Sequence, residues 1–255
     1  MTGQSESQTR RRIGLPPLQA HEFETKGTKG NPQSPIVNRQ SSIVNPVGSS
    51  SDPPPDPYVH PQALCESTCV GPGTQIWPFA HVMAGAIVGA DCNICGYAFI
   101  ESGAVLGDQV TVKNGAMIWD GVTIADDVFI GPGVIFTNDL YPRSTRAVQS
   151  RDRKGAGRLE RVATDKSGPV TTTIEAGASI GAGAVIICGV TIGSRAMIAA
   201  GAVVTHNVPP HSLCVGNPAR LAGWVCACGK PLDDQLQCRT CRRAYTIARG
   251  VVTPQ

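Results

Sequence analysis

The chain has few aromatic and few charged residues, and it contains no long hydrophobic run. Aromatic residues make up 5% and charged residues 16% of the 255 residues, whereas glycine (29) and proline (20) are plentiful. This balance suits neither a helical bundle nor a chain that is disordered throughout, and it is typical of a turn-rich β protein. The length allows one sizeable domain with an appendage.

Segments that would direct the chain to a membrane are not apparent. No stretch approaches the ~18 consecutive apolar residues of a membrane span, and the basic residues near the N-terminus are not followed by the apolar core of a signal peptide. We therefore expect a cytoplasmic protein that does not enter a membrane. The formal charge of +3 comes partly from both ends of the chain, so it makes no broad basic face, and nucleic acid is not an expected partner.

Residues 1–57 lack hydrophobic periodicity and end in a proline-rich run, which predicts a disordered tail. From Val70 to Phe136 an aliphatic or aromatic residue then returns at every sixth position, and the pattern resumes from Ile174 to Val204. The residue two places earlier is mostly small, and glycine often follows directly. A period of six fits neither an α-helix nor a simple amphipathic strand. It fits a short strand with one large and one small inward side chain, followed by a tight turn.

Three such hexads close one triangular coil, so the eighteen hexads predict six coils stacked at ~4.8 Å. Residues 137–173 interrupt the repeat and are interpreted as an insertion within one domain of residues 58–225. Residues eighteen apart share a column on adjacent coils, which places Asn114 between Gly96 and Pro132 at one corner of the triangle. By the same count Asp120 lies directly below Asn138 at another corner.

Residues 58–225 resemble the hexapeptide-repeat acyltransferases. The motifs GVTI (121–124), IGPGVIFTND (130–139) and YPR (141–143) look like the branch that N-acetylates 3-amino sugars carried on UDP or dTDP, and GNPAR (216–220) is similar to the end of the helix in many members of the wider family. The resemblance implies an all-β, left-handed parallel β-helix that works as a homotrimer. It also implies acetyl transfer from acetyl-CoA to a UDP- or dTDP-linked amino sugar, on a pathway to surface polysaccharide.

The resemblance also implies which residues form the site. An asparagine matching Asn114 is expected beside the sugar amine, with Asp120 as a hydrogen-bond acceptor; the alternative is that Asn114 and Gly115 only make a turn with φ > 0. Tyr141 and Arg143 offer an aromatic face and a fork of donors for a sugar carboxylate or diphosphate, and we group Asn138 with them as substrate-binding. Two corners are too far apart for one small site, so a trimer would have to bring the corner of one subunit against its neighbour.

Acetyl-CoA in this family lies along the outside of the later coils. Small residues around Ala182 and Ala200 leave room for its pantetheine arm, and Arg220 is suited to a CoA phosphate. The alternatives are that small residues only satisfy a tight coil and that Arg220 only caps the helix. Outward apolar residues such as Phe99 and Ile135, which a lone prism would expose, also favour a trimer.

None of the five histidines lies in a motif similar to the family's base, which leaves a histidine base open. The alternative is that the leaving thiolate takes the amine proton, in which case no side-chain base is needed. A γ-class carbonic anhydrase on the same helix would need three histidines converging on zinc, and these positions do not supply them. The histidines are His21, His60, His81, His206 and His211.

Residues 226–255, the C-terminal segment, change in character. Two close pairs of thiols, Cys226 with Cys228 and Cys238 with Cys241, match a tetrahedral structural zinc site, although the first pair has one intervening residue where two or more is usual. So small a segment has no sufficient core, and metal binding would supply its folding free energy. The other cysteines are scattered, which favours reduced thiols.

The rival interpretation is a non-catalytic β-helix scaffold or binding module that uses the zinc-ribbon-like segment as its contact surface. Ribbons of this kind sometimes bind nucleic acid, and the arginines near Cys241 keep that alternative open. The insertion and its YPR motif argue against a scaffold, which would not need them.

Overall fold

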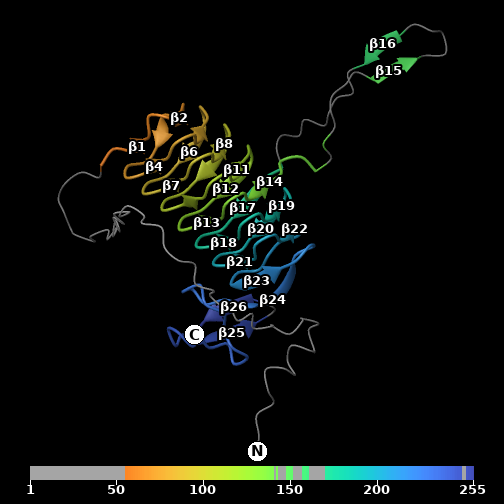
Figure 1. The fold of residues 1–255 in the computed structure, drawn as a ribbon. Coiled ribbons are helices and arrows are strands. Elements are labelled where there is room, and N and C mark those ends of the chain that lie inside the picture. Colours follow the sequence, from red (N-terminus) through yellow and green to blue (C-terminus); the bar gives the residue numbers. More distant parts are fainter. Residues whose placement is uncertain (1–54, 141, 143–147, 152–156, 161–169, 249–250) are drawn as a thin grey trace, which may run out of the picture. The chain divides into compact units, whose positions relative to one another are not determined.

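The computed structural model describes residues 55–140, 142, 148–151, 157–160, 170–248 and 251–255. These residues form β-strands and turns, and most of the strands build the parallel β-helix that the period of six predicts, with the left hand that the family resemblance implies (Figure 1). Among the described residues there is no helix with the length and apolar character needed to cross a membrane. Apart from its last three residues, the predicted tail lies outside the described residues.

Three sheets, one on each side of the triangle, make up the β-helix. The first sheet contains β1 (Tyr58–Val59), β4 (Gln75–Ile76), β7 (Asn93–Ile94), β10 (Thr111–Val112), β13 (Phe129–Ile130), β18 (Ser179–Ile180), β21 (Met197–Ile198) and β23 (Ser212–Val215), with β24 (Arg220–Trp224) antiparallel at its end. The second sheet contains β2 (Leu64–Cys65), β5 (His81–Val82), β8 (Phe99–Ile100), β11 (Met117–Ile118), β14 (Ile135–Phe136), β19 (Val185–Ile186) and β22 (Val203–Val204). The third sheet contains β3 (Cys69–Val70), β6 (Ile87–Val88), β9 (Val105–Leu106), β12 (Val122–Ile124), β17 (Thr172–Ile174) and β20 (Thr191–Ile192).

The β-helix has about seven coils rather than the six that were predicted. The count of six was wrong because it began at Val70, where the strict period starts. Val70 follows Cys65 by five positions instead of six, yet β2 still pairs in parallel with β5, and β1 with β4. A turn one residue shorter therefore hides the first coil from a search for exact sixfold spacing.

The predicted inward positions form the core. The large residues, such as Ile100, Ile118 and Ile130, and the small ones, such as Ala98 and Ala116, are buried to 1% exposure or less. Because each coil repeats the same pair of inward residues, their side chains stack in continuous ladders along the helix. Full burial of each large aliphatic side chain stabilises the fold by roughly 1.5–3 kcal/mol.

The predicted insertion leaves the helix after β14 in the second sheet, and the chain returns at β17 in the third sheet. Within it β15 (Val148–Arg151) and β16 (Gly157–Glu160) pair as an antiparallel hairpin. The insertion therefore departs from the corner between the second and third sheets, as the column count predicts.

The C-terminal segment follows β24 and ends in an antiparallel pair, β25 (Tyr245–Ala248) and β26 (Val251–Pro254). His211 of the last coil lies beside the start of this segment, because its carbonyl accepts a hydrogen bond at 2.7 Å from the N–H of Val225, the residue directly before the segment. The His211 ring also meets the Tyr245 ring edge to face, with 5.2 Å between centroids. The segment therefore packs against the end of the β-helix through a histidine that is itself buried.

Candidate functional site

Three of the predicted site residues, Asn114, Ala182 and Ala200, share one corner of the triangle. This first corner, between the first and second sheets, consists of residues 60–63, 77–80, 95–98, 113–116, 131–134, 181–184 and 199–202. Its coils are joined by backbone hydrogen bonds, including Gly133 N–H to the Asn114 carbonyl at 2.9 Å and Gly201 N–H to the Ala182 carbonyl at 2.8 Å. The predicted positioning residue and the predicted cofactor-binding residues therefore lie along a single column.

A pocket of about 460 Å³ opens on the first corner, a size within the range of small-molecule sites. Gly96 lies between Pro78 and Asn114 in this pocket. A Cβ at Gly96 would come within 2.7 Å of the Pro78 carbonyl oxygen, which is too close, and would make an ordinary contact of 3.5 Å with Asn114 Nδ2. The lining residues are Trp77, Pro78, Phe79, Asn93, Cys95, Gly96, Tyr97 and Asn114.

The aromatic residues of this pocket were not among the predicted site residues. Phe79 and Tyr97 occupy the same turn position on adjacent coils, and their rings stack with centroids 5.0 Å apart and planes 24° apart. Their exposed fractions are 49% and 64%, and their φ angles are +62° and +61°. The repeat pattern could have identified Phe79 and Tyr97, because glycine occupies the same turn position in the later coils.

The remaining pocket walls are uncharged. Trp77 Nε1 donates a hydrogen bond to Asn93 Oδ1 at 2.7 Å, which fixes the Asn93 amide. Burial raises the pKa of the Cys95 thiol, although the charge of Lys113 acts in the opposite direction. The thiol therefore stays neutral, and no carboxylate or ammonium lines the pocket.

Asp120 and Asn138 lie at a second corner, between the second and third sheets. The backbone N–H of Asp120 donates to Glu101 Oε2 at 2.9 Å, and the Asp120 carboxylate lies where a Cβ of Gly103 would be. Within one chain these residues are thus separated from Asn114 by the width of the second sheet. Tyr141 and Arg143 lie outside the described residues.

Arg220 lies at the C-terminal end of the β-helix. Its side chain is exposed, and Nη1 donates to the carbonyl of Ala219 at 2.9 Å. The N–H of Ala219 in turn donates to the Val203 carbonyl at 2.8 Å, which places Arg220 beside the coil that carries Ala200.

Four of the five histidines belong to the described part of the chain, and none of the four lines the pocket. His81 lies on the outer face of the second sheet, where Nε2 is 3.0 Å from Glu66 Oε2 and the ring meets Phe99 edge to face. His211 is buried, with Nδ1 2.9 Å from the Val225 carbonyl oxygen. None of these four described histidines is therefore placed next to Asn114 to act as a base within one chain.

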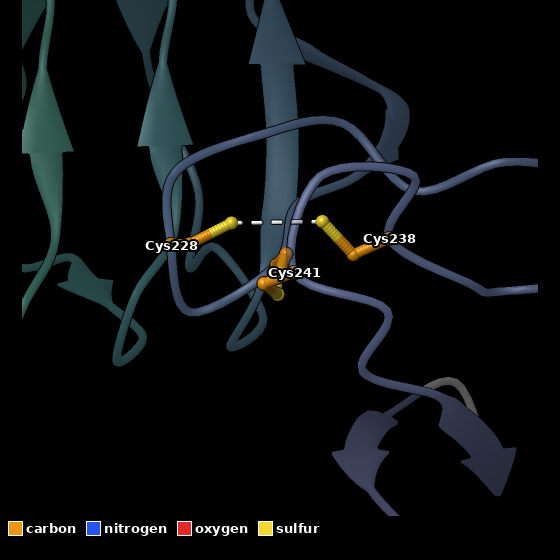
Figure 2. A group of neighbouring side chains, drawn as sticks. Cys228, Cys238 and Cys241 are labelled. Carbon is orange, nitrogen blue, oxygen red and sulfur yellow. Dashed lines mark hydrogen bonds between the residues drawn. The ribbon is translucent and has the colours of Figure 1, made fainter.

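The four predicted metal-ligating cysteines converge. Their sulfur atoms all lie within 4.8 Å of one another, with 3.3 Å between the sulfurs of Cys226 and Cys241 and 3.5 Å between those of Cys228 and Cys238. Figure 2 shows Cys228 and Cys238 pointing toward one another from two separate loops. A tetrahedral zinc with Zn–S bonds of ~2.3 Å requires sulfurs about 3.8 Å apart, so the group fits such an ion.

The two loops that carry these cysteines share a local geometry. Gly229 N–H donates to the Cys226 carbonyl and Arg242 N–H to the Cys238 carbonyl, both at 2.8 Å. Gly229 and Arg242 each directly follow the second cysteine of their pair, and their φ values are +80° and +61°. Both pairs thus form tight turns that aim two thiols at one point, despite their different spacing.

Hydrogen bonding prepares Cys226 for the thiolate form that metal binding requires. Burial opposes ionisation, but bonds from the Cys228 N–H, the Tyr245 hydroxyl and neighbouring thiols outweigh it and lower the pKa of Cys226 to about 6. Tyr245 Oη lies 3.2 Å from Cys226 Sγ and also accepts from the Ala227 N–H at 2.8 Å.

Comparison with known proteins identifies relatives of the β-helix. Residues 70–102, 103–138 and 171–206 match the bacterial transferase hexapeptide (six repeats) family. Over 199 residues the chain is 43% identical to the dTDP-3-amino-3,6-dideoxy-alpha-D-galactopyranose 3-N-acetyltransferase of Aneurinibacillus thermoaerophilus, which covers 77% of this chain and 94% of that protein.

The solved structures that this chain matches are more distant in sequence. The acetyltransferase domain of PglB from Neisseria gonorrhoeae FA1090 is 22% identical, with a TM-score of 0.41 over 65% of this chain and 57% of that chain. PerB from Caulobacter crescentus, solved in complex with CoA and GDP-perosamine, is 24% identical, with a TM-score of 0.25 over 67% of this chain and 58% of that chain.

Proposed function

The chain belongs to the hexapeptide-repeat acyltransferases, and from this premise we propose that it transfers acetyl from acetyl-CoA to the amino group of a UDP- or dTDP-linked 3-amino sugar, in surface polysaccharide biosynthesis. The observation that carries the proposal is the order of features along the first corner. An aromatic pocket lies at one end, a strip of small residues at the other, and Asn114 between them. Such an order suits two substrates that meet end to end.

Asn114 is the positioning residue in this proposal. Its exposed side chain has one amide acceptor and two donors, which suit the substrate amine and the oxyanion of the tetrahedral intermediate respectively. The amine attacks the thioester carbonyl, the C–S bond breaks, and the departing CoA thiolate takes the proton that the amine loses. This route needs no side-chain base, in agreement with a pocket that no described histidine lines.

The strip of small residues supports binding of acetyl-CoA above Asn114. A Cβ at Gly133, Gly183 or Gly201 would have no atom within 4 Å, so the surface is open along three successive coils. Ala182 and Ala200 lie in the adjacent column, and three steps of ~4.8 Å separate Asn114 from Ala200, roughly 14 Å in all. The pantetheine arm would extend along this strip, with Arg220 at its far end for a phosphate.

A homotrimer would complete the site. The outward column of the second sheet is apolar except at His81, and both corners that hold predicted site residues border this sheet. Packing between copies through this face would bring Asp120 and Asn138 of one copy toward Asn114 of another. The outward residues are Leu64, His81, Phe99, Met117, Ile135, Val185 and Val203.

We also propose a structural zinc ion in the C-terminal segment, held by Cys226, Cys228, Cys238 and Cys241. Because the ion would have four protein ligands, it would have no open position for catalysis, and its contribution would be to the folding of the segment. All ten cysteines are free of disulfides, which supports a reducing compartment such as the cytoplasm.

The test is an acetylation assay with the full chain. The protein is incubated with acetyl-CoA, a thiol reagent and a panel of UDP- and dTDP-linked amino sugars, with matching hydroxyl sugars as controls. We expect thiol release only with a 3-amino sugar, and an acetylated product by mass spectrometry. A lack of release with every amino sugar, by a protein that still binds acetyl-CoA, would favour the scaffold interpretation.

A further inference from the structure

The aromatic residues of the first corner lie at a turn position where every described residue of the same column, from Phe79 to Gly201, has positive φ. Phe79 and Tyr97 have φ of +62° and +61°, a region that bulky L residues rarely adopt. Later residues of the same column are Gly115, Gly133 and Gly183, which adopt positive φ without steric conflict. Two half-exposed aromatic residues therefore stand where glycine would be easier to accommodate.

The ladder of stacked rings ends at Tyr97. Phe79 stacks against Tyr97 at 5.0 Å, close to the spacing of the coils, so the two rings follow the helix axis. The next position in the column is Gly115, where a Cβ would have no atom within 4 Å. The space next to the Tyr97 ring, on the coil that carries Asn114, is thus open. It is one coil spacing high, which is enough for a flat ring to stack on Tyr97.

The polar groups around this opening suit an uncharged heterocycle. No charged side chain lines the pocket, and the Asn93 amide is held by Trp77 with its Nδ2 left to donate to a ring carbonyl. Lys113 precedes Asn114, and its charge is felt at Cys95, so a positive charge lies near the pocket for a phosphate. A pyrimidine nucleotide carries both features, a flat ring with carbonyl groups and a diphosphate.

We propose that this pocket is a nucleobase site, in which the pyrimidine ring of the nucleotide sugar stacks on the Phe79–Tyr97 pair. The proposal rests on the proposed function for its ligand, and it adds the residues that hold the nucleotide end of the substrate. The acceptor would then extend from the earlier coils toward Asn114, while acetyl-CoA reaches Asn114 from the later coils.

The experiment replaces each aromatic residue with glycine, which occupies the same turn position in the later coils. Phe79→Gly and Tyr97→Gly remove a ring and also relieve the positive φ, so the melting temperature is expected to stay the same or rise. Stacking on an aromatic side chain supplies a large part of the free energy with which proteins bind a nucleobase. We expect the Kd for dTDP or UDP, measured by calorimetry on the full chain, to rise at least about tenfold in Tyr97→Gly. The Kd for acetyl-CoA should not change.

Arg195→Gly is the matched control. Arg195 has φ of +56° at the corner between the third and first sheets, so the substitution relieves the same backbone conformation away from the pocket. Nucleotide affinity should be unchanged in this variant. If Tyr97→Gly fails to fold, Tyr97→Asn replaces it, because asparagine tolerates positive φ and has no aromatic ring.

The outcomes separate this inference from the proposed function. Wild-type dTDP and UDP affinity in folded Tyr97→Gly or Tyr97→Asn, together with acetylation of an amino sugar by the wild type, overturns the nucleobase site and leaves the function standing. Failure of the wild type to bind either nucleotide overturns the nucleobase site, and failure also to acetylate any nucleotide amino sugar overturns both. A melting temperature that falls along with nucleotide affinity in Tyr97→Gly, but not in Arg195→Gly, would assign the rings to packing.

Discussion

The β-helix and the C-terminal segment bury very different amounts of apolar surface for their length. In the β-helix every coil contributes large and mostly small inward residues at the same positions, so the core grows with each repeat. The C-terminal segment has a separate core of Cys226, Cys238, Tyr245 and Val252, and two of these four residues are thiols that belong to the metal-ligating group. A repeated core stabilises itself, whereas the small core depends on what its thiols bind.

The largest effect is expected from removing the metal ligands. A combined Cys238→Ser and Cys241→Ser change should abolish a metal content of about one per chain, since structural zinc supplies an apparent ~10–16 kcal/mol in small domains. Elemental analysis and limited proteolysis would show metal loss and cleavage after Trp224, while the β-helix stays resistant and acetyl transfer persists at least in part.

Cys92→Ala is the control for this change. Cys92 is buried at a small inward position of the β-helix, where it acts as a core residue, so its replacement should leave the metal content alone. Metal that depends on Cys92, or the absence of zinc from carefully reduced protein, would show that the four thiols do not act together.

A smaller loss of stability, confined to the β-helix, is expected from Ile130→Ala. Ile130 is fully buried and pairs with Val112 below and Ile180 above, so the change leaves a cavity in the ladder. We expect the free energy of unfolding by urea to fall by about 2–5 kcal/mol without loss of metal. The exposed Thr123→Ala should change it by less than about 0.5 kcal/mol. Equal losses in both variants would contradict a core organised by inward positions.

Asn114→Ala tests the site rather than the fold. The side chain is exposed, so stability should not change, but acetyl transfer should slow by about tenfold or more, equivalent to ~1.4 kcal/mol per decade. The measurement is kcat with the accepted amino sugar, and Thr123→Ala serves again as the control. Unchanged turnover would remove Asn114 from the site and leave it as a turn residue.

The smallest effect is expected from Tyr245→Phe. The change removes the hydroxyl that lies 3.2 Å from Cys226 Sγ and accepts from the Ala227 N–H. A net loss of about 0.5–1.5 kcal/mol is expected for such a hydrogen bond, which would appear as faster release of metal to a chelator. Acetyl transfer should be unaffected, and a loss of activity instead would mean that the two regions are coupled through His211 and Tyr245.

The sequence predicted most of the fold because the β-helix is coded locally. Each coil uses the same spacing, so Ile76 and Ile198 could be assigned to the core by the same rule, and the cysteine pairs were visible for the same reason. The first coil was missed where one turn is a residue shorter. Phe79 and Tyr97 were missed because hydrophobic periodicity follows inward positions, and these rings lie at an outward turn.

The sequence by itself determined the period, the inward residues, the two corners and the pairing of thiols, because each depends on spacing along the chain. Only the tertiary structure decided that Phe79 and Tyr97 stack beside Asn114, that Gly115 leaves the next step open, and that four sulfurs from two loops lie within 4.8 Å. These facts depend on φ angles and side-chain directions at turns, where neighbouring coils and loops set the geometry.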